Sequence, residues 1–194
     1  MSDGAATIAA MGKTQYYTAT TIDGFIADEN NSLEWLFQVE RSLENSGRDA
    51  FFADVGAMAM GATTYQWMID HEHVVDEPEK WRGFAGDTPA WVFTHRSLPP
   101  IPGADIRFVQ GDVAPVHAAM TAAAGDRNLW IIGGGELVGQ FADAGLLDQL
   151  ILSVAPVTLG AGAQVLPRRL VGRLRLVGVE QDRQFANLTY NVGS

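Results

Sequence analysis

The sequence feature that most constrains the fold is a short apolar run that leads directly into three glycines. Residues 129–132 read Leu-Trp-Ile-Ile, a run too short for a helix, and predict a buried strand. Glycines occupy positions 133–135, and the apolar spacing of residues 136–144 then predicts a helix that ends at Gly145. A strand, a glycine turn and a helix in this order are typical of an α/β fold.

The glycine turn has two interpretations, and its spacing alone favours neither. The first N–H groups of a helix have no partner within it, the helix dipole makes their surroundings positive, and glycines let a phosphate approach closely. A phosphate-bearing ligand is one interpretation, and a tight turn without a ligand is the other. The Rossmann fingerprint is excluded because Val138 stands where its third glycine would be, and the chain has no Walker motif.

Short strand-like runs alternate with helical stretches along nearly the whole chain. Strands are predicted at residues 16–21, 57–60, 91–94, 106–109, 129–132, 150–154, 174–179 and 185–192. Helices are predicted at residues 33–46, 49–55, 63–69, 113–125 and 136–144, and the acidic segment 70–80 is predicted to be a solvated loop.

This alternation predicts one three-layer α/β domain over residues 14–194. Its sheet is expected to be mainly parallel, with helices on both faces and an antiparallel hairpin at the C-terminal end. Residues 1–13 are expected to be a flexible N-terminal tail, because they show neither an apolar period nor the pattern of a signal peptide.

Composition and charge narrow the classes of partner. The chain has 13 Lys and Arg against 23 Asp and Glu, a formal net charge of −10, so we expect no nucleic acid and no membrane as partner. Cysteine is absent, which excludes disulfides and thiolate metal sites and fits a reducing compartment. We therefore expect a cytoplasmic protein that binds a small molecule and has no metal site.

Two further strand ends carry groups suited to a nucleotide. Gly61 ends a buried strand, and Thr63 and Thr64 follow at a helix start, where their hydroxyls either cap the helix or face a ligand. Residues 94–96 (Thr-His-Arg) follow another strand and offer a hydroxyl and a cation in an otherwise acidic chain. An ordinary surface arginine is the alternative interpretation for Arg96.

Four segments, in this order, resemble the dihydrofolate reductase-like fold, most closely its branch related to the C-terminal reductase domain of the riboflavin biosynthesis protein RibD. They are residues 19–27 (ATTIDGFIA), 60–65 (MGATTY), 132–137 (IGGGEL) and 155–162 (APVTLGAG). With the strands around them they cover nearly the whole chain. Their order and spacing are more specific than any single segment.

The resemblance implies an NADPH-dependent reductase that passes hydride to a pyrimidine- or pterin-like heterocycle, similar to the 5-amino-6-(5-phosphoribosylamino)uracil reductase of riboflavin biosynthesis. It also implies which residues bind the cofactor. Those at the nicotinamide are Ala19 and Ile26, those at the diphosphate are Gly133, Gly134, Gly135, Glu136 and Leu137, those at the adenosine side are Gly61, Thr63 and Thr64, and those at the 2′-phosphate and adenine are Thr94, His95 and Arg96.

One position departs from the family pattern. Family members often carry an arginine directly after the glycine of the second segment, where it binds the 2′-phosphate, and here that position is Ala62. Arg96 is then the cation expected at this phosphate, and we predict a modest preference for NADPH, with NADH also accepted. The resemblance further implies a homodimer, and the apolar strands near Leu150 and the turn at Pro156 fit such a surface.

The proton donor and the substrate contacts stay open at this level. Asp23 and Asp49 are the candidate acids. Asp23 either contacts the substrate or shapes an Asp-Gly turn, and Asp49 either serves the substrate ring or is an exposed helix residue. Trp35 and Phe52 are candidates for an apolar wall against a flat ring, with core packing as the alternative. Two other functions remain open: a dihydrofolate or pterin reductase, and a nucleotide-binding relative without turnover.

Overall fold

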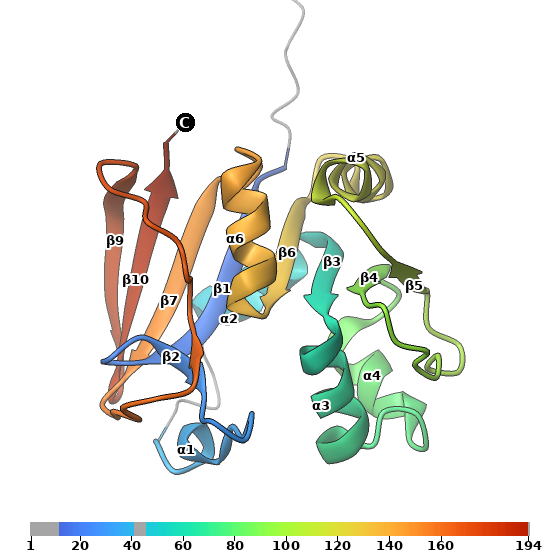
Figure 1. Cartoon of the computed structure of the whole chain (residues 1–194), viewed down its shortest axis with the longest axis horizontal. Helices are drawn as coiled ribbons and strands as arrows, with labels where there is room; N and C mark the ends of the chain where they lie inside the picture. Colours follow the sequence, from blue (N-terminus) through green and yellow to red (C-terminus); the bar gives the residue numbers. More distant parts are fainter. Residues whose placement is uncertain (1–11, 41–45, 194) are drawn as a thin grey trace, which may run out of the picture.

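The computed structural model describes residues 12–40 and 46–193 and contains one eight-stranded sheet with the order β5-β4-β3-β6-β1-β7-β10-β9 (Figure 1). A separate two-stranded sheet pairs β2 with β8. The strands are β1 (Thr14–Thr21), β2 (Phe25–Ala27), β3 (Val55–Gly61), β4 (Ala90–Phe93), β5 (Ile106–Val109), β6 (Asn128–Gly133), β7 (Gln149–Ala155), β8 (Ala163–Gln164), β9 (Leu174–Asp182) and β10 (Phe185–Val192). The helices are α1 (Glu34–Phe37), α2 (Ser46–Ala53), α3 (Ala62–Glu72), α4 (Pro78–Ala85), α5 (Val113–Ala124) and α6 (Gly135–Asp143).

The direction of the strands follows the predicted scheme. Neighbouring strands from β5 to β7 in this order pair in parallel, whereas β10 pairs antiparallel with both β7 and β9. The expected mainly parallel sheet with an antiparallel C-terminal hairpin is therefore confirmed.

β3 shows how the chain distributes apolar side chains over the two faces of the sheet. Successive side chains of a strand point to opposite faces. Ala57 and Ala59 belong to the core cluster that includes α5 and α6, whereas Met58 and Met60 belong to the cluster that includes α3 and α4. Helices therefore cover both faces of the sheet, as expected for three layers (Figure 1).

The carboxyl ends of the parallel strands meet at one edge of the sheet, which lies toward the bottom of Figure 1. β1 ends at Thr21, β3 at Gly61 and β6 at Gly133, and α3 and α6 begin directly after β3 and β6. This edge, just outside the strand ends, is where ligands bind in open α/β sheets. The segments quoted for the resemblance thus come together in space.

Two predicted segments differ from the structure. Before residue 41 the helix expected over residues 33–46 is limited to α1, because Trp35 turns into the core while Phe37 stays 69% exposed, which leaves no continuous apolar face; residues 41–45 lie outside the described residues. The acidic segment 70–80 is not a single loop. α3 continues to Glu72, and α4 begins at Pro78, a residue that suits the first helical turn.

The predicted tail over residues 1–13 lies mostly outside the described residues. Of the two that are described, Lys13 is tied to the sheet, since its backbone N–H donates to the side chain of Asn128 at 2.7 Å. The backbone at Gly12 lies close to the backbone of Arg127, because a Cβ at residue 12 would collide with it.

Candidate functional site

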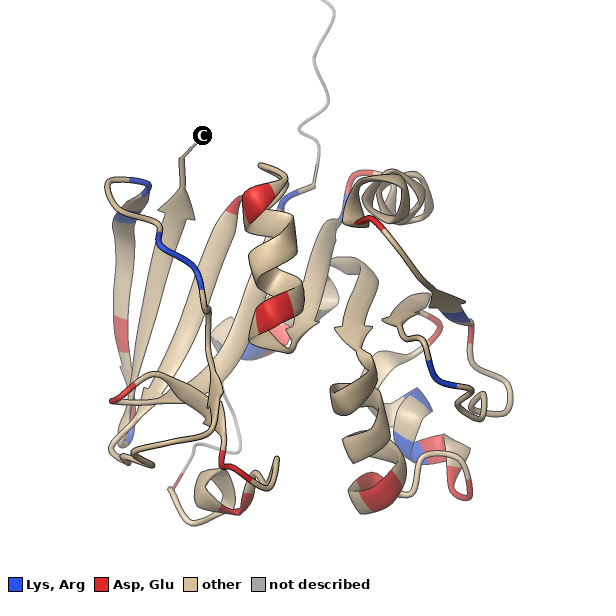
Figure 2. Ribbon diagram, in the orientation of Figure 1, with Lys and Arg blue, Asp and Glu red and all other residues tan. Residues whose placement is uncertain are grey.

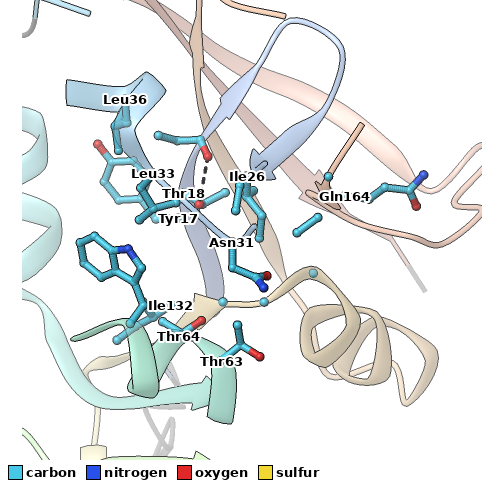
Figure 3. A pocket seen from close by; sticks show the side chains of 18 of the residues that line it. Tyr17, Thr18, Ile26, Asn31, Leu33, Leu36, Thr63, Thr64, Ile132 and Gln164 are labelled. Atoms are coloured by element: carbon cyan, nitrogen blue, oxygen red, sulfur yellow. Dashed lines mark hydrogen bonds between the residues drawn. The ribbon is translucent and has the colours of Figure 1, made fainter. Parts of the chain in front are cut away.

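A cavity of about 620 Å³ opens at the carboxyl edge of the sheet, between β1, β6, the starts of α3 and α6, and the segment around β8 (Figure 3). Most of its lining falls into two parts, and Thr18, Arg48 and Ser153 add further polar groups. The glycine end comprises residues 133–136 with Asn31, Thr63, Thr64 and Gln164. The apolar end comprises Tyr17, Leu33, Leu36, Phe52, Trp67, Met68, Trp130 and Ile132. In Figure 3, Tyr17, Leu33 and Leu36 lie on one side of the cavity and Thr63, Asn31 and Gln164 on the other.

Two helix N-termini converge at the glycine end. The N-cap residues are Gly61 for α3 and Gly134 for α6, and neither helix start has a side-chain cap hydrogen bond. A Cβ placed on Gly61 would lie 3.7 Å from the backbone N of Gly134, so the two starts are neighbours. Their first N–H groups lack partners within the helices, and the positive ends of both dipoles meet here. Such a place suits an anionic group with two phosphates.

Gly134 and Gly135 are surrounded very differently. A Cβ on Gly134 would meet nothing within 4 Å, so the backbone at this residue is open to a ligand. A Cβ on Gly135 would collide with the carbonyl oxygen of Gln164 and lie 2.8 Å from that of Val165. Residues 162–169, here called the strap, can therefore cross the start of α6 only because residue 135 has no side chain.

Arg168 holds the strap against α6. Its guanidinium nitrogens donate to both carboxylate oxygens of Glu136, at 2.6 and 3.0 Å, and its Nε donates to Asp143 at 2.7 Å. The hydrogen bonds from Arg168 hold the pKa of Glu136 below its ordinary value, and those to Glu136 and Asp143 raise the pKa of Arg168. Glu136 is therefore an ionised anchor for the strap and not a proton donor at neutral pH.

The apolar end is a group of aromatic rings from separate elements. Phe52 of α2 stacks on Tyr17 of β1 with ring centroids 6.4 Å apart, and its ring centroid is 5.0 Å from that of Trp130 of β6. The indole N–H of Trp130 donates to the carbonyl oxygen of Tyr17 at 3.1 Å, which fixes that ring. Trp67 and Met68 of α3 complete the wall. These surfaces suit a flat, largely apolar ring.

Most of the predicted cofactor-binding residues come together in the cavity. Its lining includes Ala19, Ile26, Thr63, Thr64, Gly133, Gly134, Gly135 and Glu136. Gly61 adjoins the cavity as the N-cap of α3. Leu137 directs its side chain into the core and can offer a ligand only its backbone N–H.

Residues 94–96 lie outside the cavity but at the same edge of the sheet. The strand before them, β4, pairs with β3, and Phe93 is the register partner of Gly61. Thr94 is buried, and its hydroxyl accepts from the N–H of Arg96 at 2.9 Å, which shapes the turn. His95 and Arg96 are exposed beside the start of α3.

Asp23 has the contacts of a residue that shapes a turn. Its carboxylate accepts from the hydroxyl of Thr21 and from the backbone N–H groups of Leu159 and Gly160, at 3.0 and 2.7 Å for the two amides. The hydrogen bond from Thr21 and those from the two amides lower the pKa of Asp23. Asp23 does not line the cavity; it lies at a shallower depression next to the strap.

Of the other residues predicted as an acid or as substrate contacts, one lines the cavity and two do not. Asp49 is exposed on α2 and does not line the cavity, although its neighbour Arg48 does. Trp35 is buried against Ala155 and Phe185, so it packs in the core. Phe52 lines the apolar end.

Several lining residues were not identified from the sequence. They are Tyr17, Thr18, Ala27, Asn31, Leu33, Leu36, Arg48, Trp67, Met68, Trp130, Ile132, Ser153, Gly162, Ala163, Gln164 and Pro167. Strand alternation carries a signal for Tyr17 and Trp130, since each neighbours a core residue that faces the opposite side of the sheet. Asn31 and Gln164 sit in irregular segments, where no sequence period indicates a direction.

Two classes of feature are not found in the described part of the chain. Within residues 12–40 and 46–193, no group of three or more His, Cys, Asp or Glu side chains is arranged to hold a metal ion. Over the same residues, no helix has both the length and the apolar character needed to cross a membrane.

Comparison with known proteins shows a match to one family and to a relative of moderate sequence identity. Residues 13–185 match the RibD C-terminal domain. The chain is 31% identical to the uncharacterised protein YwjB of Bacillus subtilis over 180 residues. This alignment covers 92% of this chain and 97% of YwjB.

Solved structures show the same fold at lower sequence identity. A putative riboflavin biosynthesis protein from Shewanella superposes with a TM-score of 0.74 at 23% identity, over 94% of this chain and 99% of that one. A dihydrofolate reductase from Enterococcus faecalis, solved with NADP(H), superposes with a TM-score of 0.55 at 14% identity, over 95% and 98% of the two chains. The dihydrofolate reductase-like fold predicted from the sequence is confirmed.

Proposed function

Because the chain belongs to the RibD C-terminal domain family, we propose that it is an NADPH-dependent reductase that transfers hydride to a pyrimidine- or pterin-like heterocycle. One observation carries this proposal: two uncapped helix starts meet at one end of a single cavity, and aromatic walls form the other end. The first suits a dinucleotide diphosphate and the second a flat acceptor ring. The likeness in fold to a reductase solved with NADP(H) supports the choice of cofactor.

In this proposal, different residues of the cavity bind the cofactor and orient the acceptor. Bound NADPH supplies the hydride. The N–H groups at the starts of α3 and α6 bind the diphosphate, with Thr63 and Thr64 beside them, and Ala19 and Ile26 contact the nicotinamide. The rings of Tyr17 and Phe52 hold the acceptor ring flat and exclude water, which fixes the distance over which hydride moves.

The proton that accompanies the hydride comes from water in this proposal. Among the described residues that line the cavity, Glu136 carries the only carboxyl group, and Arg168 keeps it ionised. Neither Asp23 nor Asp49 lines the cavity. The rate of turnover is therefore expected to show no dependence on a protein carboxyl group at neutral pH.

The preference for NADPH over NADH is proposed to be small. With Ala62 in place of the family's arginine, Arg96, an exposed cation shortly after β4, is the proposed contact of the 2′-phosphate. We expect NADPH to bind more tightly than NADH by a small factor, and NADH to support turnover.

A direct test separates the proposal from its two alternatives. Purified protein is titrated with NADPH and then assayed for NADPH oxidation with pyrimidines, pterins, dihydrofolate and quinones. Binding with oxidation of a pyrimidine- or pterin-type ring supports the reductase, and dihydrofolate as the best acceptor favours the alternative reductase. Tight NADPH binding without oxidation of any acceptor favours a binding protein, and no binding contradicts the proposal.

A second copy of the chain is the partner proposed for the sheet face around β9. Leu152, Leu188 and Val179 are register partners across β7, β10 and β9, so they form one row, and Val179 is 64% exposed. β7 and β10 contain no charged residue. The charged residues of β9 (Figure 2) are Arg175, Glu180 and Asp182, which pair with Asn191, Asn187 and Phe185 and so lie outside this row. In a chain with a net charge of −10, an uncharged face lets two copies meet without strong repulsion.

Sedimentation of a charged variant tests this dimer. Val179→Asp places a carboxylate in the row and is expected to give a monomer, while Glu180→Gln, one residue along the same strand, is expected to leave the dimer intact. A monomeric wild-type protein contradicts the dimer without affecting the reductase proposal.

A further inference from the structure

The carboxylate of Glu136 is a feature of the cavity that the proposed function leaves unexplained. Glu136 is in the first turn of α6 and lines the glycine end, where the diphosphate of the cofactor is proposed to bind. A carboxylate suits the N-terminus of a helix as long as no other anion binds there. A diphosphate at the same helix start would lie beside a like charge, in a chain whose formal net charge is already −10.

A guanidinium from the strap offsets this charge. Nη1 and Nη2 of Arg168 donate to the two carboxylate oxygens of Glu136, at 3.0 and 2.6 Å, which makes the pair bidentate. The side chain of Arg168 is only 22% exposed, against 66% for that of Glu136. The guanidinium is therefore held in place, and the carboxylate that it neutralises belongs to a residue that lines the cavity.

One face of α6 is shaped for this guanidinium. A Cβ on Gly139 would lie 2.7 Å from Cζ of Arg168, so the arginine crosses α6 where the helix has no side chain. Asp143 accepts from Nε of the same arginine at 2.7 Å. Residues 136, 139 and 143 are spaced by three and four positions, so they lie on one face of the helix. Arg168 therefore packs along that face between the two ends of α6.

The two acidic partners of Arg168 differ in their relation to the cavity. Glu136 lines it, whereas Asp143, the last residue of α6, does not. With a rise of about 1.5 Å per residue, the two positions are about 10 Å apart along the helix axis, which is about one Debye length at 0.1 M ionic strength. The same guanidinium thus neutralises one carboxylate near the proposed diphosphate and one that is distant from it.

We infer that Arg168 is a positioning residue for the cofactor: by neutralising Glu136 it allows a diphosphate to bind at the start of α6. This inference rests on the proposed reductase function and gives Arg168 a role beyond holding the strap. Without the guanidinium, the carboxylate of Glu136 would repel the phosphate groups. Nε, Nη1 and Nη2 of Arg168 already donate to carboxylates, so the arginine acts on the diphosphate through Glu136 and not by direct contact.

Binding of NADPH to single variants of the strap tests this role. Arg168→Gln is expected to weaken binding about fivefold, the effect of one exposed charge, as measured by the fluorescence of NADPH. Arg169→Gln removes the same charge from the next residue of the strap and is expected to change the Kd by less than about twofold, because Arg169 does not line the cavity. Urea unfolding of both variants checks that they are folded.

Rescue by a second substitution separates the effect of charge from that of structure. Adding Glu136→Gln to Arg168→Gln is expected to restore the Kd to within about twofold of wild type, whereas adding Asp143→Asn is expected to leave binding weak. A role in holding the strap alone would give the two double variants equal affinity, because each lacks the arginine and one of its partners. The defect of Arg168→Gln should also decrease as ionic strength rises.

Glu136→Gln in the wild-type background decides the question even if Arg168→Gln does not fold. Glutamine keeps an oxygen that can accept from Arg168, and loss of the carboxylate is expected to tighten NADPH binding about threefold. Unchanged or weaker binding overturns the inference, as does equal affinity of the two double variants or normal binding by Arg168→Gln. Each of these leaves the reductase proposal standing, whereas a wild-type protein that binds no NADPH contradicts the proposed function and this inference together.

Discussion

At the glycine end of the cavity the groups that face a ligand are backbone N–H groups, whereas at the apolar end they are the side chains of Tyr17, Phe52 and Trp67. The path of the chain determines where backbone groups lie. The strap passes so close to Gly135 that this path is possible only without a side chain at residue 135. Side chains are placed one at a time and can be exchanged one at a time. The two ends should therefore respond differently to substitution: the glycine end through folding and cofactor binding together, and the apolar end through the acceptor alone.

The largest effect is expected for Gly135→Ala. The added Cβ would collide with the backbone carbonyl of Gln164, and backbone cannot move aside as a flexible side chain can. We expect a loss of at least about 2 kcal/mol in the free energy of unfolding, measured with urea, and a loss of NADPH binding because the strap and α6 are displaced.

Gly134→Ala is the matched control for this substitution. A Cβ at residue 134 meets nothing within 4 Å, so the free energy of unfolding should stay within about 1 kcal/mol of wild type. NADPH should bind more weakly, since the methyl group occupies space open to the ligand. Equal stability of the two variants would contradict the role given to the strap.

At the apolar end, Phe52→Ala should affect the acceptor and spare the cofactor. The ring of Phe52 stacks on Tyr17 and contacts Trp130, so its loss removes one wall of the proposed acceptor site. The KM for the acceptor is expected to rise about tenfold, from lost stacking and burial, while the Kd for NADPH changes by less than about twofold.

Phe108 provides a control of the same type and similar exposure. Phe108 on β5 is 39% exposed against 37% for Phe52, and it contacts Tyr65 but does not line the cavity. Phe108→Ala should leave both constants unchanged. An equal rise in KM in the two variants would mean that Phe52 acts through stability and not through contact with the acceptor.

The contrast between the two ends also explains what the sequence can reveal. The strand at residues 106–109 and the turn after β6 follow from local patterns, namely a short apolar run and consecutive glycines. The glycine end could therefore be predicted from the sequence, because Gly133, Gly134 and the first residues of α6 are neighbours in the chain.

The apolar end could not be predicted in the same way. Its rings come from β1, α2, α3 and β6, and each of them taken alone has the pattern of a core residue. Trp35 illustrates the difficulty: like Phe52 it is an aromatic residue of a short helix, yet it packs against Ala155 and Phe185 in the core. The pairing of β2 with β8 is likewise long-range, and it brings Ala163 and Gln164 to the cavity.

Arg96→Ala probes how far the glycine end extends along the sheet. Arg96 is exposed after Thr94, whose hydroxyl holds the turn beside the start of α3. If its guanidinium contacts the 2′-phosphate, the ratio of NADPH to NADH affinity should fall about fivefold, the value of one exposed charge-assisted contact. Arg175→Ala, on the distant edge strand β9, should leave that ratio unchanged.

A salt titration sharpens the result for Arg96. The preference of wild-type protein for NADPH should decrease as ionic strength rises, because an exposed charge pair is screened. A ratio that neither Arg96→Ala nor salt changes would remove Arg96 from the cofactor site and leave the backbone amides as the sole determinants of phosphate binding.

The smallest effect is expected at the opposite edge of the sheet, where His117 of α5 hydrogen bonds through Nε2 with the hydroxyl of Thr14 at 2.8 Å. Burial disfavours the imidazolium and lowers the pKa of His117 below 6.5, and the charge of Asp148 opposes this only in part. The unfolded chain then binds more protons than the folded one as pH falls through 6.5, so folding stability is full above that pH and decreases below it.

His117→Gln tests this without touching the cavity, because glutamine can keep a hydrogen bond to Thr14 but cannot titrate. Between about pH 7.5 and about pH 5, wild type should lose more stability than the variant, measured by urea unfolding at each pH. NADPH affinity should be the same in both proteins at every pH. If the NADPH affinity differs between the two proteins, the amino edge of the sheet is coupled to the cavity. Stability at that edge and cofactor binding at the glycine end would then not be independent.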